Sequence, residues 1–310
     1  MYIDYIRDVA ITEIRTDLAL EAQELNKESS DKAKVFTESE TVNGIKITRQ
    51  KVISKRDELS LGKSKGTYIT IEMNSVDDDI TNADDKIYAI SDEISNLLPE
   101  DGCVLVAGIG NENITADALG PKTIEGILAT RHITHEIAAQ IGLDNLRSVA
   151  AIAPGVLGQT GVETSELILS IIKKIKPSAL IAVDALASRK LSRLGSTIQI
   201  SDAGIAPGTG VGNHRTPISK ETMGIPVISI GVPTVVDAAT LAADIIEPFD
   251  KASASRINDI ISPKASHMVV TPKDIDLLIG RCSRLVSLAI NCALQKDLTR
   301  EELITLTVNS

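Results

Sequence analysis

The chain has 310 residues, 43% of them hydrophobic and 24% charged, which is typical of a folded globular protein rather than a disordered or fibrous one. Its 32 basic and 42 acidic residues give a formal net charge of −10, so nucleic acid is not expected as a direct ligand. The three cysteines have no Cys-x-x-Cys spacing, and the sequence shows neither a signal peptide nor an uninterrupted apolar run of about 18 residues. These features predict a cytoplasmic protein that is not exported and does not span a membrane.

The first 75 residues predict antiparallel strands. Two short segments rich in β-branched residues, 44–54 and 66–73, are set between clusters of Gly, Asn, Asp and Ser. A helix is expected to follow over 82–98, because its apolar residues recur at helical spacing. Asn82 is the predicted cap of this helix and Pro99 closes it.

From residue 103 onward, short apolar runs alternate with helical patterns. The runs expected to form strands are 103–107, 148–153, 179–183, 197–200 and 226–230. A helix is expected around Ile168–Ile175, and a final helix is expected to begin at Thr271 with Asp274 completing its cap. Nearly apolar strands separated by helices are what a parallel sheet covered on both faces requires. The predicted fold is therefore α/β, a mostly parallel sheet flanked by helices, with an additional antiparallel β region over 14–75.

Carboxylates and glycines follow several of these strands. Asp117 lies in the loop after 103–107, Asp184 directly follows 179–183, and Asp237 comes after 226–230. In open α/β sheets, chemistry gathers at the carboxyl ends of the strands. A single carboxylate at such a place is more often a helix cap. Asp117 and Asp184 both precede Ala-Leu after a buried strand, and the pair together favours a functional role.

Other chemistries find weaker support. Gly108 and Gly110 begin a dinucleotide fingerprint, but its third glycine would have to be at Asn113. His135 begins a zinc-protease motif, but its second histidine would have to be at Ala139. No Gly-x-Ser-x-Gly elbow is present. We therefore expect no metal and no cofactor.

Five ordered motifs carry a resemblance to a known family. They are GIGNENITADALGP, APGVLGQTGVETSE, VDALASR, TIQISDAGIAPGTGVGN and IPVISIGVPTVVDA. Together they closely resemble the germination protease of spore-forming bacteria, over a match that runs from about Ile14 to about residue 295. The resemblance implies an atypical aspartic endopeptidase that degrades small acid-soluble spore proteins in the spore core. It also implies an α/β fold related to that of the hydrogenase maturation proteases, and a homotetramer.

The resemblance implies that Asp117 and Asp184 are the essential catalytic pair. Two carboxylates held close together cannot both ionise cheaply, so one keeps a proton while the other deprotonates a water molecule. Which of the two acts as the base stays open. The glycines before Asp117 are expected to let the backbone turn, so that this carboxylate reaches the cleft.

Four further residues are candidates to support the pair. Asn111 is expected to tether the loop through its side chain. Arg189 could act electrostatically, although a position on a solvated helix face is the simpler expectation. Glu163 and Asp202 are candidate supporting acids, for which helix capping or loop hydrogen bonding is an equal alternative.

The resemblance also implies an inactive precursor that removes its own N-terminus. Thr12-Glu13-Ile14-Arg15 is similar to the sites at which the family cuts its substrates after Glu, and Arg15 replaces the usual alanine. Residues 1–13 are therefore the expected propeptide, cut between Glu13 and Ile14, and 14–310 the protease domain. The alternatives are a frayed terminus with a chance match and, for the whole chain, a metal-dependent processing protease or a catalytically silent binding scaffold on the same fold.

Overall fold

The computed structural model describes residues 16–28, 35–73, 84–140, 143, 145–206, 216–246, 249–250 and 268–308. The expected propeptide, the bond between Glu13 and Ile14, and the helix cap at Asn82 lie outside these residues. The proposed boundary of the protease domain at residue 14 therefore stays a prediction.

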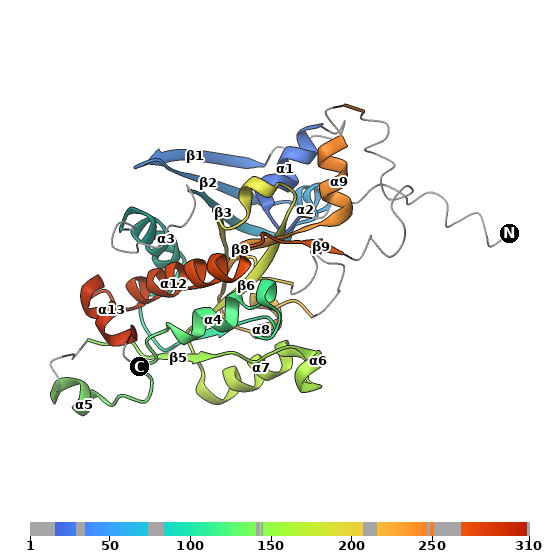
Figure 1. Ribbon diagram of the computed structural model, residues 1–310. Coiled ribbons are helices and arrows are strands. Elements are labelled where there is room, and N and C mark those ends of the chain that lie inside the picture. Colours follow the sequence, from blue (N-terminus) through green and yellow to red (C-terminus); the bar gives the residue numbers. More distant parts are fainter. Residues whose placement is uncertain are drawn as a thin grey trace.

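One sheet of nine strands organises the described chain, in the order β1-β2-β3-β7-β8-β6-β4-β5, with β9 paired to β8 (Figure 1). Its strands are β1 (Phe36–Val42), β2 (Ile45–Val52), β3 (Gly66–Glu72), β4 (Val104–Gly108), β5 (Val149–Ile152), β6 (Ala179–Ser188), β7 (Thr197–Ser201), β8 (Val227–Asp237) and β9 (Val269–Val270). The antiparallel strands expected near the N-terminus are confirmed as β2 and β3, and they belong to the same sheet as the parallel strands.

The two halves of this sheet differ in strand direction. Strands β5, β4, β6 and β8 are parallel, whereas β7 runs antiparallel to both β8 and β3. The expectation that 197–200 adds a parallel strand is therefore wrong. A parallel connection needs a crossover of about a dozen residues or more, and only 189–196 separate β6 from β7. The short connection makes the chain return in the opposite direction.

Helices lie on both faces of the sheet. They are α1 (Ala19–Glu28), α2 (Lys55–Leu61), α3 (Asp84–Leu97), α4 (Leu119–Glu125), α5 (His135–Gln140), α6 (Leu157–Thr160), α7 (Thr164–Ile175), α8 (Lys220–Met223), α9 (Ala238–Ile246), α12 (Ile275–Leu294) and α13 (Arg300–Val308), with short 3-10 turns η2 (Thr115–Asp117) and η3 (Leu191–Arg193). The layered α/β fold class is thus confirmed.

The last long helix starts later than expected. Helix α12 begins at Ile275, because Thr271 is held by the sheet: its hydroxyl donates to the carbonyl oxygen of Thr234 in β8 at 3.0 Å. Asp274 takes the cap position without a side-chain cap bond. Within the described part of the chain, α12 is the one helix long and apolar enough to cross a membrane, but 67% of its apolar window is buried inside the protein. It is the core helix of the fold.

Strands β6 and β8 are longer than their apolar runs indicate. They remain paired from Leu180 with Val227 as far as Ser188 with Val236, with a register shift between Leu186 and Ala187. Asp184 therefore lies inside β6, and the expectation that it follows the strand is wrong. The mutual pairing of these two strands provides backbone partners beyond the point where the apolar pattern stops.

The two faces of the sheet carry different cores. Side chains that alternate along β6, β8 and β7 pack on one face under α3, α4 and α12, and this cluster includes Ile181, Val183, Ile200, Ile230 and Val232. On the other face, Leu180 and Ala182 pack with α7 and α8 in a smaller cluster that ends before Asp184. Because successive side chains point to opposite faces, the second face turns polar halfway along β6.

Candidate active site

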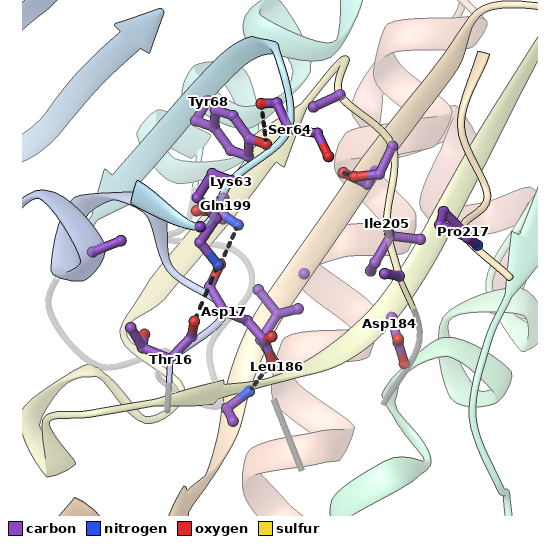
Figure 2. A pocket seen from close by; sticks show the side chains of 18 of the residues that line it. Thr16, Asp17, Lys63, Ser64, Tyr68, Asp184, Leu186, Gln199, Ile205 and Pro217 are labelled. Atoms are coloured by element: carbon purple, nitrogen blue, oxygen red, sulfur yellow. Dashed lines mark hydrogen bonds between the residues drawn. The ribbon is translucent and has the colours of Figure 1, made fainter. Parts of the chain in front are cut away.

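A cavity of about 1320 Å³ lies on the face of the sheet that α12 does not cover. Its floor is formed by residues that alternate with those packed under α12: Asp184 and Leu186 of β6, Ser229 and Gly231 of β8, and Gln199 of β7. The segment before α1, the loop after α2 and the segments after β7 line much of the rest (Figure 2). The loop after β4 and residues of α1, α2 and α8 also contribute to the lining. The cavity therefore combines parts of the chain that are far apart in sequence.

Asp117 reaches this cavity at the end of the loop that follows β4. Its Oδ2 accepts a hydrogen bond from the backbone N–H of Asn111 at 2.8 Å. Gly110 has φ of +123°, and a Cβ at this position would overlap the carbonyl oxygen of Asp117. Only glycine fits this close approach. The glycines were expected to let the backbone turn toward the cleft. The turn at Gly110 brings Asp117 to the cavity wall, as expected.

Asn111 does tether the loop. Its Oδ1 accepts from the backbone N–H of Asn113 at 3.0 Å, which closes an Asx turn, and from Nε2 of Gln159 at 2.6 Å. Its side chain thus links the Asp117 loop to the neighbouring α6 segment, while its backbone holds the carboxylate of Asp117. The predicted role is structural support of the loop, and the contacts agree with it.

Asp184 is buried in the cavity floor, with 5% of its surface exposed. Its Oδ1 accepts from the N–H of Ala185 at 2.9 Å. The preceding residue, Val183, pairs with Gly108 at the end of β4 and accepts from the N–H of Ile109 at 2.7 Å. The start of the Asp117 loop is therefore bonded to the residue next to Asp184, and this brings both carboxylates to one cavity.

Of the remaining candidates, Asp202 also lines the cavity. Its Oδ1 accepts from the N–H of Thr67 at 2.6 Å, so it joins the end of β7 to β3. Glu163 takes the cap position of α7 without a side-chain cap bond, and it does not line the cavity.

Arg189 does not line the cavity either, and the expectation of a solvated helix face for it is wrong. It directly follows β6, is 6% exposed, and its Nε donates to Asp244 at 3.1 Å. Arg189 therefore stabilises the fold by joining the end of β6 to α9.

Asp237 lies at the end of β8. Its Oδ1 accepts from the N–H of Thr240 at 2.9 Å, which is the helix-capping arrangement expected of a single carboxylate at a strand end.

Sequence patterns missed two ionisable residues in the cavity wall. Asp17, just before α1, and Lys63, after α2, both line the cavity, and the Lys63 ammonium donates to the Asp17 carbonyl oxygen at 2.9 Å (Figure 2). The stretch RTDLALEA, which begins at Arg15, matches the resembled family, but its residue types give no sign of a cavity. Contacts between segments this distant in sequence have no local signal.

The arrangement suits general acid–base chemistry by two carboxylates. Asp117 and Asp184 both line the cavity, and a carboxyl group can donate a proton in its neutral form or accept one in its ionised form. Among the described residues, no group of three His, Cys, Asp or Glu side chains is placed to hold a metal ion.

Comparison with known proteins agrees with these motifs. The family model described as Germination protease matches residues 11–252. A germination protease of Caldanaerobacter subterraneus subsp. tengcongensis is 44% identical, over 95% of this chain and 98% of the relative. One from Clostridium perfringens is 40% identical over 94% and 98%, and one from Priestia megaterium is 34% identical over 95% and 97%.

Among solved structures, the [NiFe] hydrogenase maturation protease HycI from Thermococcus kodakarensis is similar at a TM-score of 0.35 and 17% identity, covering 64% of this chain and 98% of its own. The family match spans most of the chain, and the curated relatives are matched over nearly their full length. By these matches, the chain belongs to the germination protease family.

Proposed function

We propose that this protease is an aspartic-type endopeptidase that begins the degradation of small acid-soluble spore proteins during germination. The observation that carries the proposal is that Asp117, from the loop after β4, and Asp184, from β6, line the same cavity. The cavity lies on the polar face of the sheet and is large enough for several residues of an extended peptide. Protein substrates follow from the family.

In the proposed reaction, the protonated carboxyl of the pair hydrogen-bonds the carbonyl oxygen of the scissile peptide. The ionised partner takes a proton from a water molecule, whose oxygen then forms a bond to the carbonyl carbon. The tetrahedral intermediate breaks its C–N bond as the amine leaves with a proton from the pair, and both carboxyls return to their starting state. No group beyond the pair and water is required.

The test is incubation of the purified protein with a small acid-soluble spore protein, followed by mass spectrometry of the fragments. Cleavage that persists in EDTA supports an acid pair, whereas cleavage that stops in EDTA and returns with added metal supports a metal-dependent processing protease. A complete lack of cleavage under all conditions supports a binding scaffold. The Asp117→Asn variant is the matched control, because it changes one charge in a near-isosteric side chain.

We also propose that the chain is made as a zymogen that cuts itself between Glu13 and Ile14. Thr16 and Asp17 line the cavity, and an extended chain spans at most about 3.5 Å per residue, so Ile14 can lie no more than about 7 Å from Thr16 along the chain. A tethered segment this close has a high effective concentration at the cavity. It can therefore be bound despite the unfavourable Arg15.

Mild acidification is expected to start this processing, because protonation of one carboxylate removes the repulsion within the pair. Intact mass, measured before and after the pH shift, should fall by about thirteen residues in the wild type and stay constant in Asp117→Asn. An unchanged mass in both proteins contradicts self-processing.

We further propose that the protein forms a homotetramer and acts in the spore core. Light scattering that gives a monomer mass would contradict the tetramer.

A further inference from the structure

The segment before α1 is bonded to β6 beside Asp184. The backbone N–H of Asp17 donates to the carbonyl oxygen of Ala187 at 2.9 Å, and the N–H of Ala187 donates back to Oδ2 of Asp17 at 2.8 Å. Both backbone polar groups of Ala187 therefore bond to one residue that is 170 positions away in the sequence. Ala187 lies three residues after Asp184 in the same strand.

This part of β6 has fewer strand contacts than the part before it. Pairing with β4 ends at Val183, so that only β8 remains as a paired strand beyond this point. The register with β8 then shifts between Leu186 and Ala187, an irregularity that interrupts the ladder. The Asp17 contact falls at this interruption and supplies hydrogen bonds that the sheet does not.

Asp17 is itself held in place from two sides. The Lys63 ammonium donates to the carbonyl oxygens of Thr16 and Asp17 at 3.0 and 2.9 Å, and Nε2 of Gln199 donates to the same Asp17 oxygen at 3.1 Å (Figure 2). Burial raises the pKa of the Asp17 carboxyl, against the lowering effects of Lys63 and the Ala187 N–H. Asp17 is half-buried in the cavity wall, and its contact with Ala187 is partly shielded from solvent.

Glu21 extends the same attachment along the chain. This fully buried carboxylate, in the first turn of α1, accepts from the backbone N–H groups of Arg189 at 2.6 Å and Lys190 at 3.1 Å, and it pairs with Nε of Arg193 at 3.5 Å. Asp17 therefore bonds the end of β6, and Glu21 bonds the two residues that follow the strand. Hydrogen bonds to buried charged groups are among the stronger ones in proteins.

We propose that Asp17 is a positioning residue for Asp184: its two hydrogen bonds to Ala187 hold β6 at the register shift, so that the Asp184 carboxylate keeps its orientation in the cavity. The inference rests on the proposed acid pair. Figure 2 shows Asp17 and Lys63 on one side of the cavity and Asp184 on the other, so Asp17 acts through the strand. Because a displacement of about 1 Å in a reacting group can cost about 100-fold in rate, a small movement of β6 is sufficient.

The test compares Asp17→Ala, Asp17→Asn and the control Asp92→Asn, which makes the same charge change at an exposed site on α3. The kcat and KM for a small acid-soluble spore protein are measured, together with hydrogen–deuterium exchange of the peptide that spans 184–190. Asp17→Ala should lower kcat by about 10- to 100-fold with little change in KM, and should lose protection in this peptide. Asp17→Asn keeps an oxygen that can accept from Ala187 and should recover most of the kcat. The control should match the wild type.

A merely structural role for Asp17 predicts a different result. Asp17→Ala would then be less stable, but its folded fraction would keep the wild-type kcat, and this outcome overturns the proposal. The proposal is also overturned if the kcat of Asp17→Asn is no higher than that of Asp17→Ala. If the wild type cleaves no spore protein, the proposed function fails, while the exchange measurement still shows whether Asp17 holds β6.

If Asp17→Ala does not fold, Lys63→Met carries the same test. This variant leaves the Asp17 carboxylate in place and removes the ammonium that fixes its carbonyl oxygen. A fall in kcat with KM retained and reduced protection over 184–190 is expected. An unchanged kcat in a folded Lys63→Met protein overturns the proposal.

Discussion

The two faces of the central sheet are built from the same strands, yet they serve different purposes. Under α12, the side chains of Val183, Ile200 and Ile230 form a closed apolar layer. On the reverse face, their immediate neighbours Asp184, Gln199 and Gly231 form the floor of the cavity. The period of two along a strand lets adjacent residues meet opposite requirements, so stability and chemistry can be altered separately.

The largest expected effect comes from the polar face. Asp117→Asn and Asp184→Asn should each lower cleavage of a small acid-soluble spore protein by about 10³-fold or more, because each removes one proton-transfer group. Both changes are near-isosteric, so far-UV circular dichroism and thermal unfolding should resemble those of the wild type. Near-normal turnover in either variant would show that the polar face does not carry the acid pair.

A change on the apolar face should have the opposite profile. Leu285 of α12 is 1% exposed in the cluster that covers this face. Leu285→Ala should lower the free energy of unfolding by about 3 kcal/mol through lost transfer energy and the cavity left behind. The kcat of the folded fraction should stay near that of the wild type. Denaturant titration and kinetics on the same sample measure both, and a large fall in kcat without destabilisation would break the distinction between the faces.

Gly231 tests how tightly the cavity floor is packed. It pairs with Asp184 across the β6–β8 ladder, and a Cβ at this position would clash with the side chain of Leu186. Gly231→Ala should therefore displace Leu186 and cost about 1–3 kcal/mol, with a fall in kcat/KM. Gly158→Ala is the control, because an added Cβ there meets nothing within 4 Å. Equal activity and stability in Gly231→Ala and the wild type would indicate that the floor adapts freely.

The smallest effect concerns the thiols of α12. Burial raises the pKa of Cys282 to about 12 and that of Cys292 to about 11. Near pH 8, the thiolate fractions are therefore about 10⁻⁴ and 10⁻³, and iodoacetamide should label both slowly in the native protein and rapidly in denaturant. Peptide mass spectrometry over time measures the two rates. Rapid native labelling of Cys282 would mean that the α12 face opens to solvent.

The sequence by itself determined the family, the layered α/β class and the positions of most strands. Apolar runs such as 103–107 and 226–230 lie in buried strands because a covered parallel sheet leaves few polar positions. Two of the five motifs contain Asp117 and Asp184, each directly before Ala-Leu, and the family resemblance implied that these two residues form the catalytic pair. These are local signals, carried by residues near one another in the chain.

Only the tertiary structure decided where β6 and β8 end, that β7 runs antiparallel, and which charges surround the pair. Asp184 lies inside β6 because β8 continues beside it, and the apolar pattern of 179–183 contains no information about that partner. The bond between Asp17 and Ala187 joins residues 170 positions apart, and Lys63 reaches the same place from a third segment. Such contacts depend on how distant segments pack, so their residue types carry no periodic or motif signal along the chain.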